Sequence, residues 1–222
     1  MRKIRTPSFV VGFIFVLSML CAAQSGKVET VGPLTDNAVP ERIRQVLDSK
    51  GYRLTLDGAV PACELWVRQN VPAQTRKDVE GVTYPQLAES VLVGVVHFPQ
   101  AAADFRGQKI PAGFYTLRYA LMPNDANHLG AALSRDFLIL IPAASDADPN
   151  ATFKFQELMA LSESATGTKH PGPLSLVQAD RGVTVPSVSK DDQDHWIFSA
   201  SMKLASGEEL PFALVVKGTT QQ

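Results

Sequence analysis

The sequence predicts a mainly β protein, an antiparallel β-sandwich or jelly-roll-like core with two short helices. Apolar and polar residues alternate in short runs along most of the chain, and few helical patterns separate these runs. That spacing is typical of antiparallel sheets rather than of alternating strands and helices. The clearest pair, 196–204 and 210–216, is joined by a Ser-Gly-Glu turn and is typical of a hairpin.

Residues 1–23 are typical of a signal peptide. Basic residues precede the apolar run 9–20, and small residues follow it. The run is shorter than the roughly 20 residues that a membrane-spanning helix needs, so we expect no membrane span. We predict cleavage after Ala23 and release to the periplasm or to the outside of the cell. Anchoring through an acylated Cys21 is disfavoured, because Leu20 precedes it where a very small residue is required.

Removal of the leader makes the chain mildly acidic. The basic residues fall from 21 to 18 against 22 acidic ones, and the formal charge falls from −1 to −4. This balance argues against nucleic acid as a partner. Cys63 is the one cysteine left, so the sequence predicts no disulfide framework. A buried, inert thiol is the favoured interpretation of Cys63, and a reactive thiol is the alternative.

The N-terminal third predicts a small cap on the main domain. Residues 24–37 are polar and contain glycine and proline, so we expect a flexible leader. Pro40 suits the first turn of a helix and Gly51 its C-terminal cap, which predicts a helix over 40–50. Strands at 52–56 and 62–68 complete a helix-plus-strand cap over 38–68. The polar stretch 69–82 would separate it from a β-sandwich domain over 83–218, and we expect one compact unit.

The main domain shows five further elements before its closing hairpin. The run 91–98 is apolar on both alternating faces and predicts a central strand buried on both sides. The remaining patterns predict strands over 114–122, 136–141 and 174–177, and a helix over 155–164 that ends near Gly167.

A Pro/Gly corner precedes the second of these strands, at 110–117. Pro111 and Gly113 are followed by Tyr115 at the start of a strand, as in the tyrosine corners of Greek-key sandwiches. We therefore predict that Tyr115 and Gly113 are structural, with the Tyr115 hydroxyl bonded to backbone a few residues upstream.

The run 91–142 contains Phe105-Arg106-Gly107, this corner and Arg135-Asp136-Phe137. In these features it resembles a group of uncharacterised exported bacterial proteins of unknown function. The similarity covers the central quarter of the chain and extends more faintly to Pro171. The resemblance implies secretion and a β fold, and it supplies no activity.

Polar residues gather between two predicted strands, in 124–136. This loop supplies the candidate ligand-binding residues Asp125, Asn127, His128, Arg135 and Asp136. The favoured interpretation is a loop whose Asx side chains hold its own turns, with Arg135 and Asp136 paired locally. A ligand or metal site is the alternative, although Leu129 occupies a position at which a calcium loop needs an oxygen.

A second acidic run carries weak metal candidates, which are Asp146, Asp148, Asn150 and Glu157. Their spacing matches that of a calcium loop, but Ala151 replaces the glycine that the bend needs. A turn leading into the second helix explains the same residues. The sequence therefore predicts no cofactor, with calcium as the weaker alternative.

The chain contains no Gly-x-Ser-x-Gly, His-Glu-x-x-His, Walker or Cys-x-x-Cys motif. His97 lies on an apolar strand face, which favours a hydrogen-bonded structural histidine. A convergence of His128, His170 and Asp136 would instead indicate a metal or acid/base site.

The leading functional hypothesis is an exported, non-enzymatic binding or interaction module that takes a small-molecule or protein ligand at loops 124–135 and 143–153. The alternative is a secreted hydrolase or metal-dependent enzyme with a loop-borne site built from Asp125, His128, Asp136 and His170. A structural envelope component, a third hypothesis, would need a sizeable exposed apolar patch.

Overall fold

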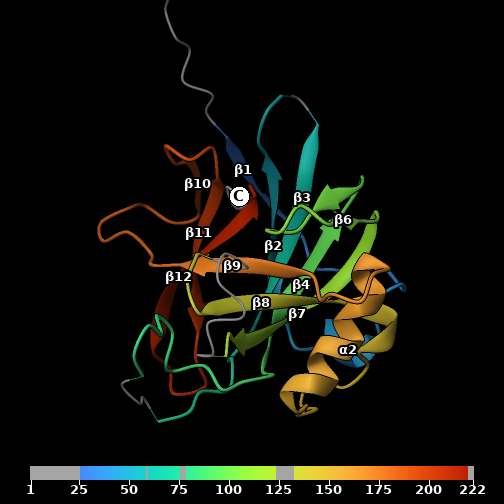
Figure 1. Cartoon of the computed structure of the whole chain (residues 1–222). Helices are drawn as coiled ribbons and strands as arrows, with labels where there is room; N and C mark the ends of the chain where they lie inside the picture. Colours follow the sequence, from blue (N-terminus) through green and yellow to red (C-terminus); the bar gives the residue numbers. More distant parts are fainter. Residues whose placement is uncertain (1–25, 59, 76–78, 124–132, 220–222) are drawn as a thin grey trace, which may run out of the picture.

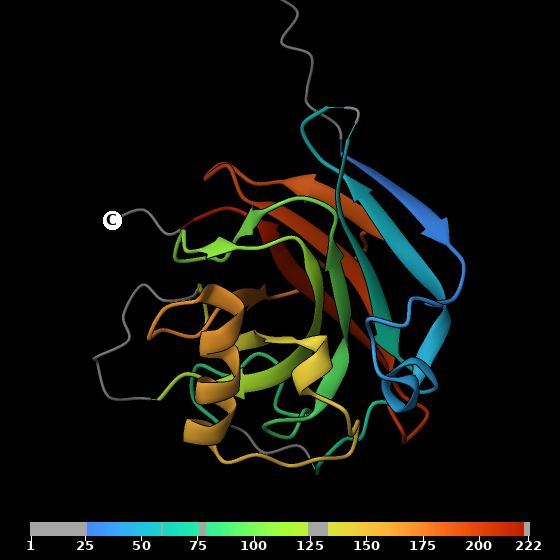
Figure 2. The same cartoon turned by 90° about the vertical axis from the view of Figure 1, so that its right-hand side faces the viewer.

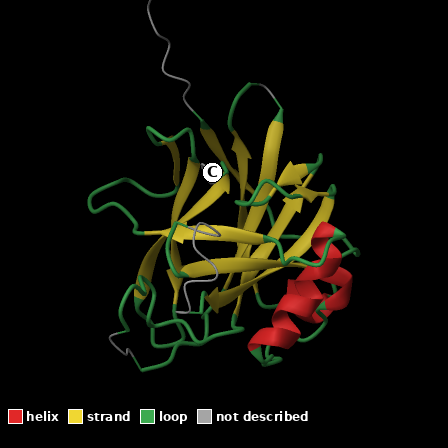
Figure 3. Ribbon diagram, viewed as in Figure 1, coloured by secondary structure: helices red, strands yellow, loops and turns green. Residues whose placement is uncertain are grey.

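The computed structural model describes residues 26–58, 60–75, 79–123 and 133–219. Strands dominate these residues, and the longer of two α-helices lies on one side of them (Figure 3). The elements, in chain order, are β1 (Lys27–Val31), α1 (Glu41–Arg44), β2 (Leu47–Thr55), β3 (Pro61–Arg68), β4 (Leu92–Phe98), β5 (Ala102–Ala103), β6 (Lys109–Ile110), β7 (Gly113–Leu121), β8 (Asp136–Pro142), the 3₁₀ turn η1 (Ala143–Ser145), α2 (Phe155–Thr166), β9 (Pro173–Val177), β10 (Ser187–Lys190), β11 (Trp196–Lys203) and β12 (Glu209–Lys217).

Ten of these strands form one antiparallel sheet, in the order β1-β2-β3-β4-β7-β8-β9-β12-β11-β10. The edge strands β1 and β10 come into contact, so the sheet curls into a nearly closed, barrel-like shape (Figures 1 and 2). Gly26 lies at this seam. A Cβ atom there would stand 2.5 Å from Val188 Cγ1 and 2.7 Å from the Trp196 ring, so only glycine allows the edges to approach this closely.

The prediction of a mainly antiparallel β protein with two short helices is confirmed, whereas the sandwich or jelly-roll arrangement is not. The two facing walls belong to a single sheet, because β12 pairs with β9 through Ala213↔Val177 and Leu214↔Leu176. In a sandwich and in a curled sheet, inward and outward residues alternate alike. Alternation in the sequence therefore could not distinguish the two.

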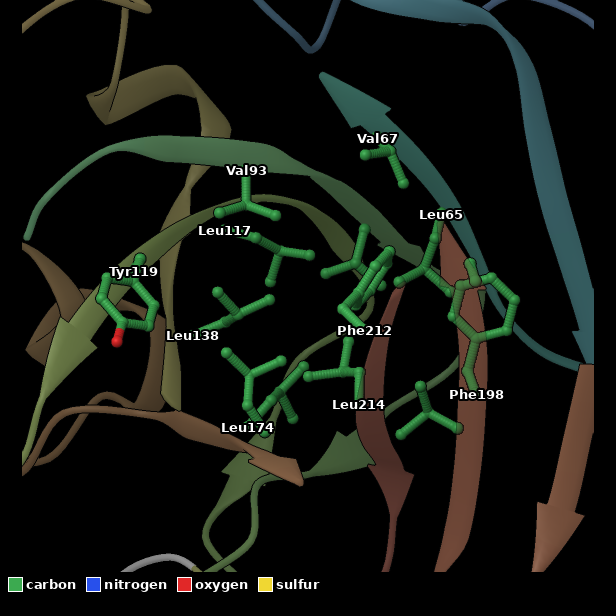
Figure 4. Packing of buried hydrophobic residues seen from close by; sticks show 14 of the residues in the cluster. Leu65, Val67, Val93, Leu117, Tyr119, Leu138, Leu174, Phe198, Phe212 and Leu214 are labelled. Carbon is green, nitrogen blue, oxygen red and sulfur yellow. The ribbon is translucent and has the colours of Figure 1, made fainter. Parts of the chain in front are cut away.

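The core fills the interior of the curled sheet (Figure 4). Leu117 and Leu138 point inward from one wall, towards Phe212 and Leu214 from β12. Each of these four side chains is at most 3% exposed. Burying one such side chain stabilises the fold by about 1.5–3 kcal/mol, so this interior is the main source of stability.

Helix α2 covers the outer face of β8. Leu158 packs there against Phe137 and Ile139, and the Ser162 hydroxyl donates to the Leu140 carbonyl at 2.6 Å. Strand β8 is thus buried on both faces, which explains its uninterrupted apolar sequence. The helix ends near Gly167, as predicted, and this residue forms a left-handed C-cap with a φ of 66°.

The N-terminal third differs from the prediction. The helix ends at Arg44, and the chain enters β2 at Leu47. Gly51, predicted as a helix cap, lies inside β2 beneath the indole of Trp66, where a Cβ would stand 2.3 Å from Nε1. The segment 24–37, predicted as a flexible leader, contains β1, which pairs with β2. The predicted cap is therefore continuous with the main sheet, because β3 pairs directly with β4.

Most of the other predicted elements are confirmed, among them the doubly buried β4, the strands β7, β8 and β9, and the β11–β12 hairpin. The short strands β5, β6 and β10 were not predicted. The tyrosine corner is confirmed, since the Tyr115 hydroxyl donates to the Pro111 carbonyl at 2.8 Å.

Residues 69–75 and 79–91, which we call the closing segment 69–91, cross the lower end of the curled sheet in Figure 1 and close it. Val71, Tyr84 and Leu87 from this segment are each at most 3% exposed and belong to the core. The Val71 amide donates to the Lys203 carbonyl at 2.9 Å. The Tyr84 hydroxyl donates to the Val177 carbonyl at 2.5 Å and accepts from the Ala213 amide.

Among the residues that the structure describes, no helix has the length and apolarity that crossing a membrane requires.

Candidate functional site

A cavity of about 850 Å³ opens at the opposite, upper end of the curled sheet, which we call the upper mouth. The β2–β3 turn, the segment before β5 and the end of β12 surround it. Its lining combines apolar and polar residues, which are Leu56, Asp57, Val60, Pro61, Ala62, Phe98, Gln100, Ala101, Ala102, Ala103, Gln193, Asp194, Val216, Lys217, Gly218 and Thr219.

The inner part of the cavity is apolar. Leu56, Phe98 and Val216 are each at most 7% exposed and are continuous with the core. Each stands at or next to the upper end of its strand, β2, β4 or β12, where the inward-facing pattern of that strand ends. The rim carries Val60, an exposed apolar side chain with 59% of its surface accessible. An apolar molecule in this cavity would therefore contact carbon on several sides.

The charged groups of the lining are paired. Lys217 donates to the Asp57 carboxylate across the mouth, between residues 160 positions apart in sequence. Trp196 Nε1 also faces this carboxylate, at 3.2 Å from each oxygen. The hydrogen bond from Lys217 holds the pKa of Asp57 below its ordinary value, although partial burial opposes it. Asp194 is paired with Lys190, at 2.9 Å.

His195 supports the wall that Gly218 and Thr219 form. Its imidazole is buried, with Nδ1 3.0 Å from the Asp191 carboxylate and Nε2 3.3 Å from the Thr219 carbonyl. Gly218 lies directly over the ring, and a Cβ at this position would stand 2.4 Å from His195 Cδ2. The His195 side chain therefore positions the last residues of the described chain and faces the cavity only through them.

Of the five residues in the first predicted ligand site, the structure describes two, Arg135 and Asp136. Asp125, Asn127 and His128 lie outside the described residues. Arg135 donates to the carbonyls of Met122, at 3.2 Å, and of Glu80, at 2.7 Å. The Arg135 side chain is therefore bonded to backbone carbonyls of two nearby segments.

Asp136 is fully buried and holds the closing segment 69–91. Its carboxylate accepts from the amides of Thr83 and Tyr84, at 2.7 and 2.9 Å, and from the Tyr119 hydroxyl, at 2.6 Å. Burial and this hydrogen bond raise the pKa of Tyr119. The expected local pair with Arg135 is replaced by these contacts, and Asp136 plays a structural part at the lower end.

The weak calcium candidates are engaged by other groups. Asp146 is buried against Arg118, Asn150 accepts from Arg68 at 2.7 Å, and the partly exposed Asp148 faces Arg42 at 3.2 Å. Glu157 instead accepts from the amide of Lys154, which begins α2. In the part of the chain that the structure describes, no three or more His, Cys, Asp or Glu side chains are grouped so that they could hold a metal ion.

The described histidines are dispersed. His97 Nδ1 is 3.2 Å from Glu64, and its ring stacks on Phe114 at 4.2 Å, as expected for a structural histidine. His170 lines a groove of about 390 Å³ beside α2, while the Asp136 carboxylate faces the segment 69–91. Burial raises the pKa of Cys63 to about 12, which agrees with an inert thiol.

Sequence reasoning missed the upper mouth. Its lining comes from segments near residues 60, 100, 193 and 217, and each is either apolar or a short polar turn. Phe98 and Val216 were predicted to be strand residues, and nothing in the sequence distinguishes a strand end that lines a cavity from one that is capped. Comparisons with family models, with curated proteins and with solved structures find no match to this chain.

Proposed function

We propose that this protein is an exported binding protein that takes a small organic molecule with an apolar body in the upper mouth. The observation that carries the proposal is the cavity of about 850 Å³ whose inner lining is apolar and whose rim carries polar side chains beside Val60. Ligand sites in proteins typically measure 300–1,000 Å³ and combine a mostly apolar lining with a few polar groups. The proposal of export rests on the signal-peptide pattern of residues 1–23.

The charged groups considered for catalysis already bond to other groups of the protein, and this favours binding over catalysis. Asp57 and Lys217 bond to each other, and His195 is covered by Gly218 and Thr219. A general base needs to reach the reacting proton within about 3 Å, directly or through one water. Asp136, which the hydrolase hypothesis requires, is buried by its bonds to the segment 69–91. These contacts support a binding module.

A fluorescent, uncharged apolar probe tests the proposal. N-phenyl-1-naphthylamine emits strongly only when it leaves water, so we expect its emission to rise on titration with the protein. Ala101 is exposed and lines the cavity, and Ala101→Trp should occupy ligand space and weaken binding at least about tenfold, or roughly 1.4 kcal/mol.

The matched control is Ala160→Trp, which adds the same side chain at an exposed position of α2. This variant should bind the probe as the unaltered chain does. Absence of a rise in emission, or equal weakening by both variants, would refute a ligand site at the upper mouth.

A further inference from the structure

We infer that the ligand of the upper mouth is electrically neutral, an uncharged amphiphile whose polar end bonds to the rim. This inference rests on the proposed function and names its ligand class. It follows from how the charges and the uncharged polar groups of the rim are arranged.

Lys217, the one cation among the described lining residues, and the Asp57 carboxylate already compensate each other's charge. Lys217 donates to Asp57, and Trp196 Nε1 faces the same carboxylate. The Asp57 side chain is 29% exposed and that of Lys217 is 57% exposed, so the pair is only partly solvated. A carboxylate ligand would have to compete with Asp57 for Lys217, and an ammonium ligand with Lys217 for Asp57. Either exchange leaves one protein charge without its partner, which has a cost in a partly desolvated site.

The charge of Asp194, the other anion at the rim, is also compensated by a neighbouring cation. Asp194 pairs with Lys190, whose ammonium lies 5.8 Å from the centre of the Trp196 ring. The Asp194 side chain is 87% exposed, so water screens what remains of its charge. The rim therefore offers no strong field that would select a charged head group.

Uncharged polar side chains stand at the same rim. Gln100, Gln193 and Thr219 are exposed and line the cavity. Amides and hydroxyls both donate and accept, so they can bond a hydroxyl, carbonyl or amide head group without a change of charge. The apolar lining below them would take the chain of such a ligand.

A series of ten-carbon probes that differ only in the head group tests this inference. We would measure displacement of N-phenyl-1-naphthylamine from the full chain at pH 7 by 1-decanol, decanoate and decylammonium. We expect 1-decanol to bind at least about tenfold more tightly than either ion, the ratio that corresponds to about 1.4 kcal/mol. Tighter binding of decanoate or of decylammonium than of 1-decanol would overturn the inference while leaving the cavity as the site.

Two charge variants add a readout that does not depend on head-group size. Asp57→Asn frees Lys217 and should strengthen decanoate binding, whereas Lys217→Gln frees Asp57 and should strengthen decylammonium binding. Affinity for 1-decanol should change less than about threefold in both, well below the tenfold step. Equal effects on all three probes would contradict the charge argument. If none of the probes displaces the dye, or if Ala101→Trp does not weaken 1-decanol binding, it is the proposed function that fails.

Discussion

Arg118 and Asp146 form an ion pair that is buried on both sides, with Nε and Nη2 of the arginine 2.6 and 2.7 Å from the two carboxylate oxygens. The remaining donors of Arg118 bond to the carbonyls of Ser90, Ala151 and Asp148. Asp146, at the start of the acidic run 146–150, therefore neutralises an arginine on the outer face of β7. Both oxygens of the Asp146 carboxylate, the first of the weak calcium candidates, are therefore bonded to Arg118.

Removing the acidic partner should destabilise the fold strongly. Asp146→Ala leaves the Arg118 charge buried without compensation, and we expect the free energy of unfolding to fall by about 3–5 kcal/mol. Urea denaturation measures this. The control is Asp148→Ala, which removes a partly exposed carboxylate that pairs with Arg42 and accepts from the Asn150 amide, and it should cost only about 1 kcal/mol. A calcium-dependent rise in the stability of the unaltered chain that both variants abolish would contradict this account.

The closing segment 69–91 depends on one buried carboxylate. Asp136→Ala removes the carboxylate that accepts hydrogen bonds from the amides of Thr83 and Tyr84 and from the Tyr119 hydroxyl, so these three donors lose their partner. We expect a loss of stability of on the order of 3 kcal/mol and faster amide hydrogen exchange at residues 83–84.

Tyr115→Phe is the matched comparison for this site. It removes a single hydroxyl-to-carbonyl bond at the other end of the sheet, so it should cost about 1 kcal/mol and leave exchange at 83–84 unchanged. Unaltered exchange at those amides in Asp136→Ala would show that the carboxylate does not hold the segment.

Cys63 should be unreactive while the protein is folded. Its thiol is buried, and its pKa of about 12 leaves almost no thiolate at pH 8. We expect a maleimide reagent to label the peptide that contains Cys63 only after denaturation, as followed by mass spectrometry. Labelling of the native protein within minutes would contradict the burial of this strand.

The ion pair at the upper mouth should give a specific pH dependence. Because Lys217 lowers the pKa of Asp57 in the folded state, the pair stabilises the protein above the unfolded value of about 3.9. This stabilisation is lost as pH falls through the lower folded value. Lys217→Met should therefore cost up to about 1 kcal/mol at pH 7 and progressively less towards pH 2. A cost that stays constant over this range would show that the pair is not the cause.

Most strands could be predicted from the sequence, but the helix over 40–50 and the site could be predicted only in part. Ile43 and Leu47 are buried in the same cluster as Trp66, yet Leu47 belongs to a strand. The reason is tertiary, since β1 and β3 pair on either side of β2. Asp136 was identified as a candidate because it is polar between strands. Its partners Thr83 and Tyr84 lie more than fifty residues away, and no local pattern reveals them.

The most direct test of a ligand site at the upper mouth uses the two tryptophan indoles as reporters in one ¹H–¹⁵N spectrum. Trp196 Nε1 donates to Asp57 beside the cavity, while Trp66 Nε1 donates to the Gly32 carbonyl on the outer face of the sheet. On titration with 1-decanol, we expect saturable shifts of the Trp196 indole and of backbone amides at 100–103 and 217–219, with the Trp66 indole unmoved. Shifts confined to other regions, or none at saturating 1-decanol, would contradict the account.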